Sequence, residues 1–206
     1  MPETTPLIYV VDDDEAVRDS LSLLFESEGL RAEAFDSAGA FLDKFDRARP
    51  GCIVADVRMP GMSGVELLDK LQAEGASVPI ILITGHGDVP MAVAALKAGA
   101  ADFFEKPFDD ALLVASVRGA LEATDVHRRR AVEDGELRAR MATLTARERE
   151  VMDLVVAGHS NKVVAARLAI SPRTVEVYRA RVMEKMQARS LAEIVRMAIR
   201  LDKADT

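Results

Sequence analysis

Short apolar runs and amphipathic segments alternate five times over residues 1–122, and this alternation is the feature that most constrains the fold. A short apolar run is typical of a buried strand, whereas apolar residues at helical spacing indicate a helix. Strands that alternate with helices form a parallel sheet with helices on both faces. The expected strands are 7–11, 31–35, 52–56, 79–84 and 102–105, and the expected helices are 15–28, 38–45, 64–73, 90–97 and 109–122.

Polar side chains close four of the expected strands. They are Asp12 and Asp13 after the first, Asp56 and Thr84 at the ends of the third and fourth, and Lys106 after the fifth. The carboxyl ends of parallel strands meet at one edge of the sheet, where ligands bind, so these side chains should converge. Clustered carboxylates suit Mg²⁺, and a carboxylate can accept a phosphoryl group whose charge a lysine and a hydroxyl stabilise. One acid alone is as well explained as a helix cap, but the ordered set predicts a phosphoryl acceptor at Asp56.

Charge divides the chain into two parts. Residues 1–122 hold 10 Lys and Arg against 22 Asp and Glu, a formal charge of −12, whereas residues 141–206 hold 12 against 8, a charge of +4. Such asymmetry predicts two domains with different partners. No apolar run reaches the length of about 18 residues that a membrane span needs, and the N-terminus does not resemble a secretory signal. Together with the single cysteine, Cys52, which we expect to be a buried thiol, this favours a reducing cytoplasm.

The last third of the chain has helical periodicity only. Segment 123–143 is rich in charge, including an arginine run at 128–130 that we interpret as a solvated face, and should form a largely helical connector with Gly135 as a break. Four helices should follow in residues 144–206. Their start signals are the capping pairs Thr145/Glu148 and Ser190/Glu193, the N-cap Ser160, and Ser171 before Pro172.

The third of these helices has two distinct faces. Val175, Val182 and Met186 align on a side that should pack. The opposite side carries small, polar and basic residues, which suits the DNA major groove: Arg173, Glu176, Val177, Ala180, Arg181 and Glu184. Periodicity alone leaves open a helical bundle that binds another protein.

Residues 7–122 resemble the receiver domain of two-component response regulators, a doubly wound, flavodoxin-like fold with five parallel strands. The matching motifs are Val11-Asp12-Asp13, the segment 56–64, the segment 84–88 and Lys106-Pro107-Phe108. The resemblance implies that a sensor histidine kinase phosphorylates Asp56 and that Thr84 and Lys106 contact the phosphoryl group. It implies that Mg²⁺ is bound by Asp12, Asp13, Asp56 and the backbone carbonyl of Arg58. It also implies a conformational switch through Thr84 and Phe103.

Residues 141–201 resemble the LuxR/NarL-type helix-turn-helix, through the segments 144–151, 161–162 and 171–179. The resemblance implies contact with promoter DNA by Lys162, Arg173, Thr174, Glu176, Val177, Arg179, Ala180 and Arg181. Whether Glu176 accepts from a cytosine amine or is a simple surface acid stays open.

Both parts together resemble response regulators of the FixJ type. The division would be a receiver at 1–122, a connector at 123–143 and a DNA-binding domain at 144–206. This type implies a homodimer when phosphorylated, which recruits RNA polymerase and activates nitrogen-fixation or low-oxygen genes. The same scaffold can answer other signals.

Three other functions fit less well. A phosphatase of the haloacid-dehalogenase type needs a second acid two residues after its nucleophile, where this chain has Arg58, so we expect no enzyme. A protein-binding role for the helical part would not explain Arg173, Arg179 and Arg181. A receiver that only dimerises, independently of phosphorylation, would not need its acid, threonine and lysine set.

Overall fold

The structure is a computed structural model that describes residues 5–85 and 89–204, and it confirms the predicted α/β and all-α architecture. The strands are β1 (Leu7–Val11), β2 (Arg31–Phe35), β3 (Gly51–Asp56), β4 (Ile80–Thr84) and β5 (Asp102–Glu105). They form one parallel sheet in the order β2-β1-β3-β4-β5. In this register Val11 pairs with Ala55, and Asp56 pairs with Ile83, so the carboxyl ends of β1, β3 and β4 lie at one edge.

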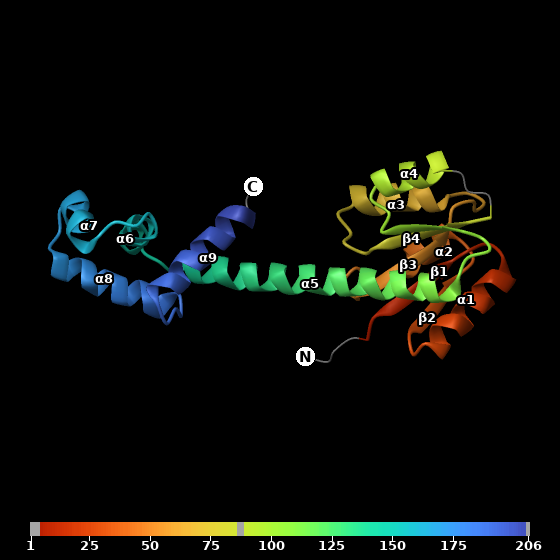
Figure 1. Cartoon of the computed structure of the whole chain (residues 1–206), viewed down its shortest axis with the longest axis horizontal. Coiled ribbons are helices and arrows are strands. Elements are labelled where there is room, and N and C mark those ends of the chain that lie inside the picture. Colours follow the sequence, from red (N-terminus) through yellow and green to blue (C-terminus); the bar gives the residue numbers. More distant parts are fainter. Residues whose placement is uncertain (1–4, 86–88, 205–206) are drawn as a thin grey trace. The chain divides into compact units, whose positions relative to one another are not determined.

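Helices cover both faces of the sheet (Figure 1). One face packs on α1 (Glu15–Ser27) and α5 (Asp110–Ala142), and the other packs on α2 (Ala38–Lys44), α3 (Gly64–Ala73) and α4 (Val89–Lys97). Strand β1, which has a neighbouring strand on each side, shows why. Leu7, Tyr9 and Val11 point into the core beneath α2, α3 and α4, while Ile8 and Val10 point to α1 and α5. Because both faces are buried, the strand is apolar throughout.

Several expected boundaries were off by one residue at an end. Helix α1 stops at Ser27, and Gly29 follows it with a positive φ of 73°, a conformation that glycine adopts without strain. Strand β3 begins at Gly51, where an added Cβ would lie 2.4 Å from the carbonyl oxygen of Leu7. Cys52 is buried as expected, and burial raises the pKa of its thiol to about 12.

The expected break at Gly135 was wrong, since α5 is one helix of 33 residues that continues through it. A glycine in a helix interior costs only about 1 kcal/mol relative to alanine. Tertiary contacts offset that cost: Leu137 is buried, and Arg200 Nη2 and Nε donate to Glu133 at 2.8 Å and to Asp134 at 2.5 Å. The chain forms two compact units, one ending at His127 and the other starting at Arg128, so the division falls within α5 and within the expected connector.

The second unit contains the four expected helices after α5: α6 (Ala146–Val156), α7 (Asn161–Leu168), α8 (Pro172–Lys185) and α9 (Leu191–Ala204). The capping box at Thr145 and Glu148 is confirmed. Ser160 occupies the N-cap position of α7, but its side chain makes no capping hydrogen bond. At α9, Ser190 Oγ accepts from the N–H of Glu193, but the Glu193 carboxylate accepts from Arg189 rather than from Ser190.

The turn between α7 and α8 contains a strained residue, Ala169, with φ 53° and ψ 44°. A left-handed conformation costs a residue with a Cβ about 1–2 kcal/mol, and glycine avoids this cost. We expect Ala169→Gly to stabilise the second unit by about 0.5–1 kcal/mol after the extra unfolded-state entropy of glycine is subtracted. Thermal unfolding should show a midpoint higher by about 2–5 °C. The control, Ala166→Gly in the interior of α7, should lower the midpoint; a lower midpoint for Ala169→Gly would contradict the argument.

Candidate functional site

One lysine joins two carboxylates at the carboxyl edge of the sheet. Lys106 Nζ donates to Asp12 Oδ2 and to Asp56 Oδ1, each at 2.8 Å. Asp12 is 1% exposed and Asp56 is 7% exposed, so the two acids share one cation in a nearly closed pocket. The lysine is held from the backbone as well, because its N–H donates to the carbonyl of Thr84 at 2.7 Å.

Backbone groups fix the remaining oxygens of both acids. Asp12 Oδ1 accepts from the N–H of Asp14 at 2.9 Å, and Asp56 Oδ2 accepts from the N–H of Arg58 at 2.7 Å. Asp14 is the N-cap of α1, and its side chain accepts from the N–H of Ala16. The two carboxylates are therefore oriented before any ligand binds.

A residue that sequence reasoning missed, Arg18, holds the loop that carries the acids. Its Nη1 donates to the carbonyl of Asp12 at 2.8 Å and to the carbonyl of Asp13 at 3.0 Å. Asp13 itself is exposed at the same strand end. Arg18 follows the acid pair by one turn of α1, a spacing that would have identified it once the helix start was placed.

Electrostatics in the pocket follow from burial. Burial raises the pKa of Asp12, and the hydrogen bonds from Lys106 and Asp14 only partly oppose that rise. Burial alone would lower the pKa of Lys106, but its hydrogen bonds to Asp12 and Asp56 outweigh it and raise that pKa. Two carboxylates against one ammonium leave the pocket with a net negative charge, which favours the approach of another cation.

The two expected switch residues lie on the adjacent strands β4 and β5. Thr84 ends β4 and is 1% exposed, and Phe103 pairs with Leu82 on the neighbouring strand. Phe103 is half-buried and packs against the core beneath α4. The motif residues His86, Gly87 and Asp88 lie outside the described residues.

The described residues do not contain a preformed cluster of metal-binding side chains. Within residues 5–85 and 89–204 there is no group of three or more His, Cys, Asp or Glu side chains arranged to hold an ion. Asp12, Asp13 and Asp56 carry the oxygen ligands that Mg²⁺ prefers, and Asp13 is the exposed member of the three. Mg²⁺ also keeps several of its waters, so it needs few protein ligands.

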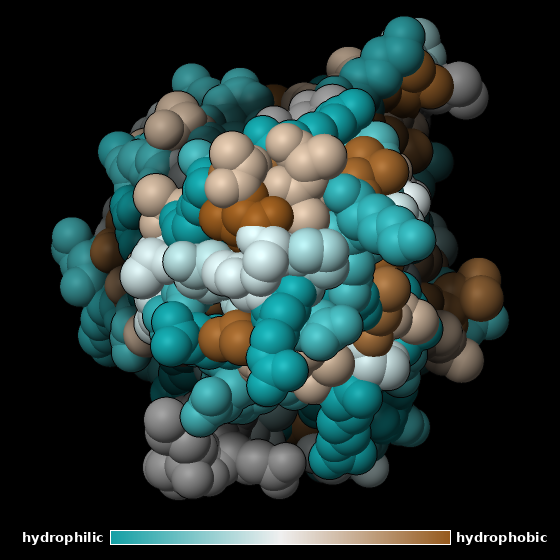
Figure 2. Space-filling view, turned by 90° about the vertical axis from the view of Figure 1, so that its left-hand side faces the viewer, coloured by the Kyte–Doolittle hydropathy of each residue, from teal (hydrophilic) through white to brown (hydrophobic). Residues whose placement is uncertain are grey.

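In the second unit, α8 presents the two faces expected from its sequence. Val175, Val182 and Met186 are buried. The residues expected on the opposite face are exposed: Arg173, Glu176, Val177, Ala180, Arg181 and Glu184. Lys162 on α7 is exposed too. Figure 2 views the second unit from the end at which α7 and the start of α8 lie in Figure 1, and hydrophilic side chains surround small hydrophobic patches there.

Thr174 and Arg179, which were expected to contact DNA, make hydrogen bonds within the protein. The Thr174 hydroxyl lies 2.8 Å from the hydroxyl of Ser171, the N-cap of α8, whose Oγ also accepts from the N–H of Thr174. Arg179 is half-buried, and its Nη1 donates to Asn161 Oδ1 at 2.6 Å.

A buried ion pair that the sequence did not indicate joins α6 to α8. Glu148 is 3% exposed, and its Oε2 accepts from Lys185 Nζ at 2.6 Å and from the N–H of Thr145 at 2.8 Å. The hydrogen bond from Lys185, followed by that from the Thr145 backbone, lowers the pKa of Glu148 to about 2. Since the folded state binds this proton less tightly than the unfolded chain, the pair stabilises the unit above pH 4.5 and loses its effect as pH falls to about 2.

We expect Glu148→Gln to lower the unfolding midpoint of the second unit by about 5 °C or more at pH 7. The difference from the unsubstituted chain should shrink as pH falls from about 5 to 2, because protonation of Glu148 then removes from the unsubstituted chain the charge that the variant already lacks. Differential scanning calorimetry across that pH range measures it, with the exposed Glu150→Gln as the matched control. A difference that stays constant with pH would contradict the buried pair.

Comparison with known proteins adds to these observations. Residues 8–118 match the response regulator receiver domain family, and residues 142–198 match the luxR family of bacterial regulatory proteins. The chain is 55% identical to the transcriptional regulatory protein FixJ of Azorhizobium caulinodans over 97% of its own length and 94% of the relative's. This chain is a FixJ-type two-component response regulator. Its relatives include FixJ of Bradyrhizobium diazoefficiens, 51% identical over 94% of each chain.

Solved structures agree with this membership. The response regulator is 40% identical to StyR, with a TM-score of 0.85 over 95% of this chain and 99% of StyR. It is 49% identical to full-length FixJ from B. japonicum, with a TM-score of 0.60 over 97% and 98% of the two chains. A receiver joined to a LuxR-type DNA-binding domain implies a sensor kinase and promoter DNA as partners of this regulator. None of the helices in the described parts of the chain is long and apolar enough to span a membrane.

Proposed function

We propose that Asp56 accepts a phosphoryl group from a sensor histidine kinase. A carboxylate oxygen of Asp56 attacks phosphorus, the bond between phosphorus and the kinase imidazole breaks, and the imidazole keeps the electron pair and takes up a proton. The observation that carries this proposal is the double contact of Lys106 with Asp12 and Asp56. An ammonium already placed at Asp56 can stabilise the charge of a phosphoryl group there without rearrangement of the chain.

Mg²⁺ would be bound by Asp12, Asp13, Asp56 and the carbonyl of Arg58, and it would supply positive charge for the transferred group. The chemistry of the donor set supports this, since burial leaves the two inner acids with a single cation between them. Arg18 contributes by fixing the carbonyls of the loop that carries Asp12 and Asp13. Thr84 then bonds the phosphoryl group, and Phe103 turns inward against the α4 side of the core.

The consequence of phosphorylation would be a homodimer that binds promoter DNA through the second unit and activates transcription with RNA polymerase. Exposed Lys162, Arg173 and Arg181 would contact phosphates, and Glu176, Val177 and Ala180 would face base edges. Thr174 would contribute through the N-terminus of α8. The similarity to FixJ over nearly the whole chain supports nitrogen-fixation or low-oxygen genes as targets.

A different signal is the second candidate. The regulator is also 47% identical to the C4-dicarboxylate transport transcriptional regulatory protein DctR of Rhodobacter capsulatus, over 92% of its length. A mobility-shift assay on promoters from both groups, with and without acetyl phosphate and Mg²⁺, distinguishes the candidates. Size-exclusion chromatography of the same samples reports dimer formation. We expect a phosphorylation-dependent shift with the nitrogen-fixation promoters together with a dimer; binding that ignores acetyl phosphate would refute the proposal.

A further inference from the structure

Arg179 differs from the other arginines of α8 in its surroundings. Arg173 and Arg181 are exposed, whereas Arg179 is half-buried and donates to Asn161 Oδ1 at 2.6 Å. Asn161 is the first residue of α7. Because arginine only donates, the oxygen of the Asn161 amide faces the guanidinium and its NH₂ group faces away. One hydrogen bond thus joins the middle of α8 to the start of α7.

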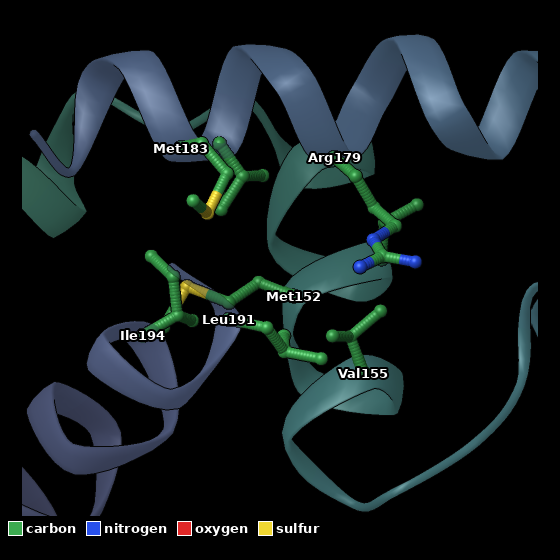
Figure 3. A pocket seen from close by; sticks show the side chains of 8 residues that line it. Met152, Val155, Arg179, Met183, Leu191 and Ile194 are labelled. Atoms are coloured by element: carbon green, nitrogen blue, oxygen red, sulfur yellow. The ribbon is translucent and has the colours of Figure 1, made fainter. Parts of the chain in front are cut away.

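The same side chain also lines a hollow between three helices. Arg179 borders a small hollow of about 10 Å³ that is lined by residues of α6, α8 and α9: Val151, Met152, Val155, Val182, Met183, Leu191 and Ile194. Figure 3 shows its side chain reaching from α8 toward Val155 on α6. A hollow of this size is no ligand site. The side chain of Arg179 therefore extends from α8 toward α6, and its charged end bonds Asn161 of α7.

Helix α7 packs on α6 and α8 through a small apolar cluster, and polar contacts at its ends add to that packing. It has only eight residues, of which Val164 and Ala165 are buried, and its N-cap Ser160 makes no side-chain capping bond. Its other end is held in the same way, since Arg147 of α6 donates to the carbonyl of Leu168. Two arginines, one at each end, thus connect α7 to its neighbours.

We propose that Arg179 is a positioning residue that fixes α7 against α6 and α8, and that it is not itself a phosphate contact. This inference deepens the DNA-binding role of the second unit. It predicts an effect on affinity that differs in kind from the loss of a phosphate contact. Removing a phosphate contact lowers the slope of log Kd against log salt by about 0.9, because one fewer counterion is released. Removing a positioning contact weakens binding and leaves that slope unchanged.

The test measures binding of the full-length chain, treated with acetyl phosphate and Mg²⁺, to a labelled duplex that the unsubstituted chain selects from random-sequence DNA. Arg179→Met should weaken binding by about tenfold or more, the effect of losing a hydrogen bond to a charged group, with the salt slope changed by less than about 0.3. Asn161→Ala, which leaves the arginine charge in place, should weaken binding to a similar degree. The double variant should bind DNA no more weakly than the weaker-binding of the two single variants, because both substitutions remove the same contact.

Three results would overturn the proposal. They are a slope lower by about one for Arg179→Met, unchanged affinity for Asn161→Ala, and additive effects in the double variant. Far-UV circular dichroism shows whether each variant folds. If Arg179→Met does not fold, the affinity and salt slope of Asn161→Ala test the proposal by themselves. Arg181→Met, at an exposed position, is the matched control for loss of charge from α8. If the unsubstituted chain selects no duplex, the DNA-binding proposal fails, a result separate from these three.

Discussion

Asp56→Asn should abolish phosphorylation of the response regulator while the chain stays folded. An amide does not form the acyl phosphate that a carboxylate forms, so the loss should be complete rather than partial. The fold should persist, because the single oxygen of asparagine can still accept from the N–H of Arg58 or from Lys106, and the change removes one of two buried carboxylates that share one ammonium. Intact-mass spectrometry after incubation with acetyl phosphate and Mg²⁺ measures the phosphoryl group directly.

The matched control for this substitution is Asp43→Asn, which changes an exposed aspartate on α2 by the same single group. It should acquire the phosphoryl group like the unsubstituted chain. Continued phosphorylation of Asp56→Asn would place the acceptor at another residue. Equal loss in both variants would mean that general charge, rather than the position of Asp56 beside Lys106, governs the reaction.

A fragment of residues 144–206 should be largely unfolded, whereas residues 128–206 should fold. The shorter fragment lacks the buried Leu137 and the packed Met141, and Arg200 loses its partners Glu133 and Asp134. Each buried side chain of this size contributes about 1.5–3 kcal/mol, and a unit of this length has only a few kcal/mol of stability to lose. Circular dichroism and thermal unfolding of both fragments measure the difference.

A single substitution tests the same idea in the full chain. Leu137→Ala should cost the second unit about 2–5 kcal/mol, because a buried leucine is truncated. Val132→Ala, in the same helix but 58% exposed, should leave stability nearly unchanged. Equal unfolding midpoints for fragments 144–206 and 128–206 would show that α5 is a simple linker after all.

The sequence predicted the sheet and its polar edge because each depends on local patterns. The strands β1, β3 and β4 were identified from short apolar runs, and the contact of Lys106 with Asp12, 94 residues away, followed from the rule that strand ends converge. The alternation of strands and helices predicted the fold class, but it did not by itself specify the order of the strands in the sheet. Helix ends were within one residue where a glycine or a cap residue lay close to them.

The contacts that the sequence did not predict depend on which helices meet. Nothing near Glu148 indicates Lys185, which lies 37 residues away on another helix, and the capping box alone explained the glutamate. Arg179 is a basic residue in the helix that was expected to contact DNA, but its partner Asn161 became evident only from the packing of α7 against α8. Gly135 was expected to end a helix because the tertiary contacts around it are not encoded nearby.

The junction between the two units is a point at which the receiver of such a regulator can be exchanged. Residues 126–133 of α5 are all exposed, so neither hydrophobic core extends into this stretch. A different receiver can be joined at this point without repacking either core, provided that the helix is continuous and that residues from Arg128 onward are retained. The stretch is thus a natural site for exchanging the domain that receives the signal while the domain that reads the DNA is kept.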